Sequence, residues 1–145
     1  MRDRALLTGL WLLAFVASLL IVESYVGRLN AQGQQILLTE DRLPTIQPLI
    51  KLYGAYLVGI LGFWFAKPLP EASTDRASRI RFVLAVACTL LFNLCVLYLV
   101  AGEHRHPGGM VLADVENAVK LGAWLSLLVA PVNAYYFGMK TAAAS

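Results

Sequence analysis

Long runs of apolar residues alternate with short polar segments along this 145-residue chain. An α-helix that crosses the roughly 30 Å hydrocarbon core of a bilayer needs about 20 apolar residues. Four stretches contain no Asp, Glu, Lys or Arg: 5–22, 52–66, 82–102 and 121–139. The second is short, but Lys51 and Lys67 bracket it, and lysine stems can snorkel toward water. The pattern predicts an all-α polytopic membrane protein of one domain, a bundle of four transmembrane helices with approximate spans 5–25, 49–66, 81–102 and 118–139.

The composition agrees with insertion in a membrane. Hydrophobic residues make up 59% of the chain and charged residues 14%, whereas soluble domains average about 45–50% and about 25%. The helices of a soluble bundle usually keep a polar stripe that faces water, and residues 82–102 have no such water-facing stripe. The first apolar run is longer than the roughly 7–15 residues of a signal-peptide core, so we expect a retained helix.

The distribution of Lys and Arg predicts the orientation. Basic residues are dense in the N-terminal tail and in the segment between the second and third spans, and cytoplasmic loops carry such an excess. The residues on this side are Arg2, Arg4, Lys67, Arg76, Arg79, Arg81 and Lys140. We therefore expect both termini on the cytoplasmic side, most simply of a bacterial inner membrane. The net charge of +3 then reflects loop topology, and no nucleic-acid partner is expected.

The segments between the spans contain residues that predict where helices continue, turn and begin. Tyr25, Leu29 and Ile36 recur at helical spacing, which predicts that the first helix continues beyond the membrane. Residues 39–48 read as a turn region, with Pro48 in the first turn of the second helix. The expected helix caps are Ser73, Thr74 or Asp75 for the third helix and Asp114 for the fourth.

The fourth span has a small residue at every fourth position. The row consists of Ala118, Gly122, Ser126, Ala130, Ala134 and Gly138. Small residues at this spacing let two helix backbones approach closely, and Ala55 and Gly59 form a matching pair on the second span. The neighbouring helix can belong to the same chain or to another subunit. Pro131 interrupts the row, and Asn133 is a candidate to bind the carbonyl that this proline frees.

A few polar residues lie within the spans. Thr89 and Asn93 form a stripe with Ala85, and such a stripe usually hydrogen-bonds to another helix; a polar pathway is the alternative. Asn133 is a further intramembrane polar residue, and Glu23 lies near the membrane interface, where it can face water, accept a proton or pair with Arg28.

The residues that most often bind metals or form disulfides are few. His104 and His106 are candidate zinc or copper ligands in a loop, but the H-x-H spacing brings two rings together only in an extended strand. We expect this loop to be solvated, with no metal or cofactor. Cys88 and Cys95 are seven residues apart on one predicted helix, about 10 Å along its axis, too far for a disulfide. They are expected to be packing residues.

No motif of a known catalytic class stands out, and an enzyme needs convergent catalytic groups. We therefore expect a non-enzymatic membrane module that assembles with itself or serves as an accessory subunit of a larger membrane complex, with membrane lipid and other membrane proteins as partners. The alternative is an oligomeric channel, transporter or pore-forming effector, because a narrow hydrophobic pore needs little sequence signature.

Overall fold

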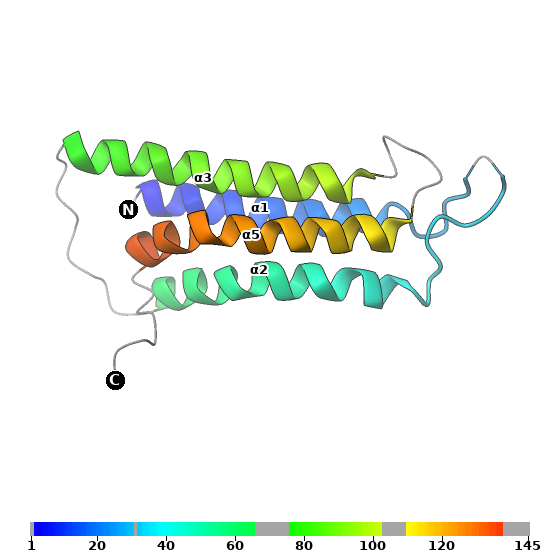
Figure 1. Ribbon diagram of the computed structural model, residues 1–145. Coiled ribbons are helices and arrows are strands. Elements are labelled where there is room, and N and C mark those ends of the chain that lie inside the picture. Colours follow the sequence, from blue (N-terminus) through cyan, green and yellow to red (C-terminus); the bar gives the residue numbers. More distant parts are fainter. Residues whose placement is uncertain (1, 31, 66–75, 103–109, 138–145) are drawn as a thin grey trace.

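The computed structural model contains four long helices that run side by side as a bundle (Figure 1). It describes residues 2–30, 32–65, 76–102 and 110–137. Within these residues the helices are α1 (Arg2–Glu23), α2 (Arg42–Phe65), α3 (Arg76–Val100) and α5 (Val111–Phe137). Each is long and apolar enough to cross a membrane. The prediction of an all-helical bundle with four helices of membrane-spanning length is confirmed, which indicates a membrane protein.

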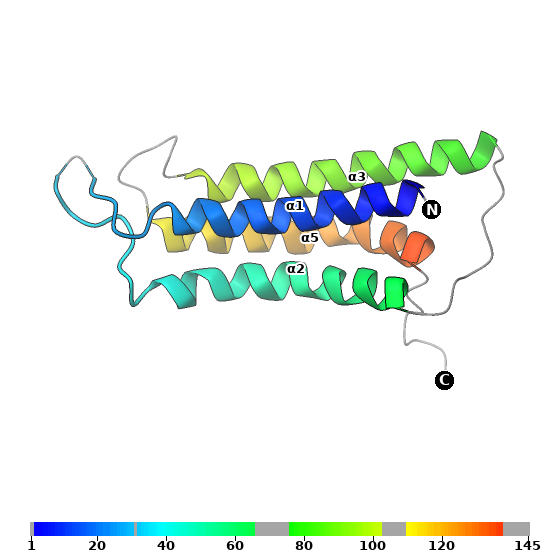
Figure 2. The ribbon, with the colours of Figure 1, turned by 180° about the vertical axis from the view of Figure 1, so that it is seen from behind.

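Two helical hairpins make up the bundle. Each hairpin pairs two antiparallel helices, α1 with α2 and α3 with α5, as both views show (Figures 1 and 2). The hairpins pack so that α1 lies beside the parallel α3, and α2 beside the parallel α5. The pairs α1–α5 and α2–α3 occupy the diagonals. All four helices therefore contribute side chains to one central axis.

The helices α2 and α5 begin earlier than the apolar pattern predicted. Helix α2 starts at Arg42, so Pro48 lies inside the helix and not in its first turn as predicted. The first turn is held by Asp41, whose carbonyl accepts both the backbone N–H and the hydroxyl of Thr45. Helix α5 starts at Val111 with Asp114 in its first turn, so Asp114 is not the residue that precedes the helix. The predicted caps of α3 lie outside the described residues.

The segment that follows α1 is not a continuation of that helix, contrary to the prediction. Gly27 and Gly33 have φ angles of 73° and 76°, a left-handed conformation that ends a helix and that glycine adopts without steric cost. The chain then folds back on itself, because Ile36 N donates to the Arg28 carbonyl at 2.8 Å. Asn30 Oδ1 closes the tip by accepting two backbone N–H groups, at 2.9 and 3.0 Å.

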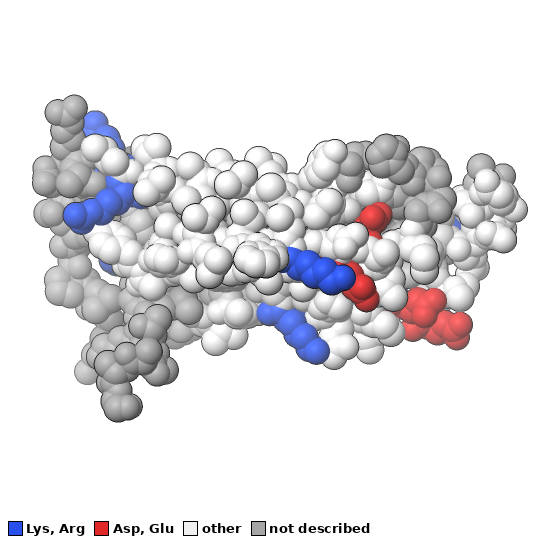
Figure 3. Space-filling view, viewed as in Figure 1, with Lys and Arg blue, Asp and Glu red and all other residues white. Residues whose placement is uncertain are grey.

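The outside of the bundle is apolar along its length. Large hydrophobic side chains on several helices face outward, among them Phe65 at 90% exposed, Trp124 at 74% and Val58 at 72%. In the space-filling view, basic side chains lie at one end, acidic side chains lie toward the other, and two basic side chains lie nearer the middle (Figure 3). Arg4, Arg79 and Arg81 belong to the end where α1 and α3 begin, called the basic end below. This distribution is what a bilayer demands, since lipid tails solvate apolar side chains and exclude charge.

Candidate functional site

Four aromatic rings from three helices fill the centre of the bundle. Trp11 of α1 stacks on Tyr56 of α2, with ring centroids 4.5 Å apart. Its indole also contacts Phe92 of α3 at 5.1 Å and Tyr53 at 6.0 Å. Trp11, Tyr53 and Phe92 are fully buried. We call these four residues the aromatic core. Sequence reasoning missed it, although aromatic residues away from the ends of the spans were the available signal.

The two tyrosines of the aromatic core connect α2 to its neighbours through their hydroxyl groups. The Tyr56 hydroxyl donates to Ser126 Oγ on α5, and Ser126 donates in turn to the Gly122 carbonyl at 2.8 Å. The Tyr53 oxygen lies 3.3 Å from Ser18 Oγ on α1. Each tyrosine therefore satisfies its polar group through a serine on an adjacent helix, which fixes the rotation of α2 within the bundle.

The polar stripe on α3 faces the interior of the bundle. Ala85, Thr89 and Asn93 are all buried. However, the hydrogen bond seen for Asn93 runs from Nδ2 to the Thr89 carbonyl of its own helix, at 2.8 Å. Asn93 Oδ1 and Thr89 Oγ1 are buried with no hydrogen-bond partner. The expected hydrogen bond from this stripe to another helix is therefore not formed.

Among the described residues, Asn133 alone has two buried side-chain polar atoms without a hydrogen-bond partner. It is 1% exposed, and neither its Nδ2 nor its Oδ1 has a hydrogen-bond partner. The suggestion that Asn133 binds the carbonyl freed by Pro131 is therefore wrong. A buried polar group without a partner costs about 1–3 kcal/mol. Trp11 Nε1 is unpaired as well, so the core combines dense packing with several polar groups that the fold leaves unmatched.

The row of small residues on α5 turns from the inside of the bundle to its surface. Ala118 and Gly122 are buried, Ser126 is half-buried and Ala130 is exposed. Four residues turn a helix by about 400°, so a row at this spacing drifts by about 40° at each step. Ala134 is half-buried, and Gly138 lies outside the described residues. The first half of the row thus packs within the chain, and Ala130 faces outward.

The contact that the small row makes within the chain is with Leu52 of α2. A Cβ placed on Gly122 would lie 2.8 Å from Leu52 Cδ2, so glycine makes room for the leucine. The matching pair proposed from the sequence is oriented differently, since Ala55 is exposed and Gly59 is half-buried. Helices α2 and α5 run parallel. Gly59 follows Leu52 by seven residues on α2, and Ala130 follows Gly122 by eight residues on α5. These two small residues therefore stand at about the same level.

Glu23 forms an ion pair at the end of the bundle opposite the basic end. Its Oε2 lies 2.7 Å from Nε of Arg42, and both side chains are about half exposed. This partner, at the start of α2, was not indicated by the sequence. Exposed pairs of this kind contribute about 0–1 kcal/mol, so the pair connects the ends of α1 and α2 without dominating the stability of the fold.

The candidate metal and thiol residues show no shared site in the described part of the chain. His104 and His106 lie outside the described residues. Among the described residues no three His, Cys, Asp or Glu side chains are arranged to hold a metal. Cys88 and Cys95 are free thiols, each half-buried.

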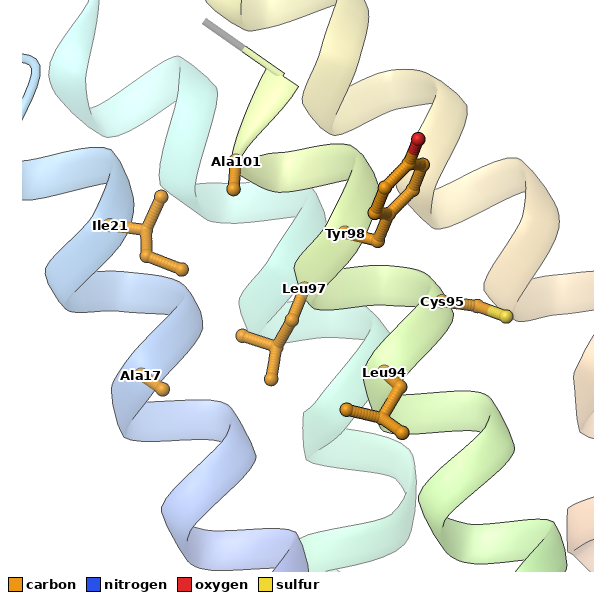
Figure 4. Close-up of a pocket in the computed structure, with 7 residues that line it drawn as sticks. All are labelled: Ala17, Ile21, Leu94, Cys95, Leu97, Tyr98 and Ala101. Atoms are coloured by element: carbon orange, nitrogen blue, oxygen red, sulfur yellow. The ribbon is translucent and has the colours of Figure 1, made fainter. Parts of the chain in front are cut away.

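An apolar groove runs along the outside between α1 and α3 (Figure 4). The groove is open to the outside of the bundle and has a volume of about 600 Å³. Ala17 and Ile21 line it from α1, and Leu94, Leu97 and Tyr98 are among the residues that line it from α3. Its walls are almost entirely hydrocarbon, so the groove offers shape and apolar surface and no arrangement of catalytic groups.

Comparison with known proteins adds no functional information. No protein-family model, curated protein or solved structure matches this chain.

Proposed function

We propose that this protein is a non-enzymatic membrane module that assembles through its helices, as a homo-oligomer or as an accessory subunit of a larger membrane complex. The observation that carries the proposal is the aromatic core, because it fills the axis that a conducting single bundle would leave open. Trp11 and Phe92 meet there across two helices. The interior is thus used for packing, and the apolar exterior is left for lipid and partner helices.

The assembly surface that we propose is the outer face of α2 and α5 around Gly59 and Ala130. Ala55 and Ala130 are exposed, and Gly59 and Ala134 are half-buried. In lipid the hydrophobic effect does not drive helices together, so association depends on close contact of backbones, which small residues allow. Two adjacent helices that both present small residues can therefore accept a helix of another subunit.

The variant Ala130→Leu tests this surface. We expect it to shift the purified protein to a smaller species in detergent or nanodiscs while leaving its thermal midpoint unchanged, because the added side chain points away from the bundle. Ala87→Leu, at an exposed position of α3, is the matched control and should preserve the native size. A wild type that is monomeric in the same measurement would contradict self-assembly, and a size equally altered by both variants would contradict this location of the interface.

The alternative function is an oligomeric channel or transporter, which the buried polar atoms of Thr89, Asn93 and Asn133 that have no hydrogen-bond partner favour. Permeant ions need polar groups to replace their hydration, and one chain supplies few. We expect no rapid ion flux from liposomes that contain the purified protein and an ion-sensitive dye. A rapid flux that Asn93→Leu abolishes without a change in assembly would defeat the module and establish the channel.

We also propose that both termini face the cytoplasm of a bacterial inner membrane. The basic end supports this orientation, since Arg4, Arg79 and Arg81 lie there and positive charge is retained on the cytoplasmic side. A reporter that is active only outside the cytoplasm, fused after Ser145, is expected to be silent in cells. Strong reporter activity would reverse the proposed orientation.

A further inference from the structure

Two arginine side chains at the basic end are held by aromatic rings. The guanidinium carbon of Arg4 lies 4.7 Å from the centre of the Phe63 ring. Arg81 donates from Nη1 to the Tyr135 hydroxyl at 3.0 Å, and its guanidinium carbon lies 5.6 Å from the Tyr135 ring. A guanidinium that rests on a ring is held in place, and its five N–H donors allow an arginine to bind more than one acceptor.

The two arginines stand at the same level of the bundle. Ala17 of α1 and Leu94 of α3 line one groove, and the two helices run parallel. Arg4 precedes Ala17 by thirteen residues on α1, and Arg81 precedes Leu94 by thirteen residues on α3. Both side chains also lie within electrostatic range of the Tyr136 hydroxyl, as does the carboxylate of Asp3. Two immobilised cations and one acidic group therefore share this end.

The acidic side chains of the described residues are concentrated elsewhere. Apart from Asp3, they belong to the far end of α1, to the segment that leads into α2 and to the start of α5: Glu23, Glu40, Asp41, Asp114 and Glu116. The space-filling view shows the same separation, with acidic side chains away from the basic end (Figure 3). Among the described residues, basic side chains therefore outnumber acidic ones at the basic end.

The basic end borders directly on apolar surface. On α3, the neighbours of Arg81 are exposed: Ile80 at 63%, Val83 at 62% and Leu84 at 59%. On α2, Phe65 is 90% exposed. A ligand that contacts the arginines and these side chains together must carry an anion next to a hydrocarbon chain. A soluble phosphate compound or an acidic protein segment satisfies only the first requirement.

We propose that the basic end binds anionic phospholipid, with phosphate groups held by Arg4 and by Arg81 and acyl chains along the exposed apolar side chains of α3. Arginine hydrogen-bonds phosphate oxygens in a bidentate geometry. A zwitterionic lipid binds less well, because its own ammonium group is repelled. Each arginine near an anionic membrane surface contributes about a fivefold preference. The inference requires insertion in a membrane but not the assembly role proposed above.

Native mass spectrometry of the purified protein tests the proposal, with phosphatidylglycerol and phosphatidylcholine supplied at equal concentrations in mixed micelles. We expect the wild type to retain phosphatidylglycerol preferentially. The double variant Arg4→Gln/Arg81→Gln is expected to lose at least about fivefold of this preference. The matched control is Lys51→Gln/Lys120→Gln, which removes two exposed cations from other parts of α2 and α5 and should keep the preference.

Four outcomes would overturn the proposal. Equal retention of the two lipids by the wild type would show that the basic end does not select anionic lipid. An equal loss in the lysine control would mean diffuse attraction by net charge. Displacement of the lipid by glycerol 3-phosphate would mean a soluble phosphate ligand.

A salt titration of the wild type gives a result that does not depend on the folding of any variant. The preference for phosphatidylglycerol should fall as ionic strength rises. A preference independent of salt would contradict the arginine–phosphate contact.

Discussion

Trp11→Ala is expected to lower the stability of the bundle by up to about 3–5 kcal/mol, the cost of truncating a large buried aromatic side chain in a soluble protein. Trp11 is fully buried, and its ring contacts Tyr56, Tyr53 and Phe92 on two other helices. In a bilayer the loss comes from the cavity and from lost van der Waals contacts, because no gain from leaving water is available. The thermal midpoint of helix loss in detergent, followed by circular dichroism, measures the effect.

Two variants separate packing from other causes. Trp124 is 74% exposed on α5, so Trp124→Ala removes the same side chain without opening a cavity and should change the midpoint little. Trp11→Phe keeps an aromatic ring and removes the unpaired Nε1 donor, so it should cost much less than Trp11→Ala. Equal midpoints for Trp11→Ala and Trp124→Ala would show that the aromatic core does not hold the bundle together.

Gly122→Leu is expected to destabilise the bundle by about 1–3 kcal/mol, the usual cost of overpacking a core. Even the Cβ of a new side chain would lie 2.8 Å from Leu52 Cδ2, and the remaining leucine atoms would push α2 and α5 apart. Gly122→Ala should be milder, because the atom it meets is the end of a flexible side chain. The same thermal measurement applies.

Gly62→Leu is the matched control for this substitution. Gly62 is an exposed helical position on α2, and a Cβ placed there has no heavy atom within 4 Å. Replacement of glycine in a helix also gains roughly 0.8–1 kcal/mol of helix propensity, so the control should be neutral or slightly stabilising. If both leucine variants had the midpoint of the wild type, the contact between Gly122 and Leu52 would have no structural weight.

For the interior polar residues, the hydrophobic pattern and the spacing of the sequence predicted burial but not hydrogen-bond partners. Thr89 and Asn93 were identified from the sequence as an inward-facing stripe, and they are buried. Their hydrogen bonds could not be predicted, because a side-chain partner depends on the rotation and level of each neighbouring helix. Asn93 bonds within its own helix, whereas Tyr56 and Ser126, which no motif joined, meet across α2 and α5.

The segment after α1 shows a second case in which residue spacing in the sequence predicted the wrong structure. Tyr25, Leu29 and Ile36 have helical spacing, but spacing records only which residues can share a face. Gly27 and Gly33 adopt positive φ angles, and the chain bonds to itself at Gly27 and Ile36 instead. A local backbone preference thus overrode the periodic pattern, and the helix ended at Glu23.

The sequence by itself determined that the chain forms four apolar helices of spanning length, because the length of an uncharged run and the cost of burying charge are local properties. It also determined which ends of the helices are basic. The tertiary structure alone decided that Gly122 receives Leu52 while Ala130 faces outward, and that Trp11 becomes the centre of the core. These outcomes depend on how four helices rotate and slide against one another, and one small change in rotation moves a residue from the interior to the surface.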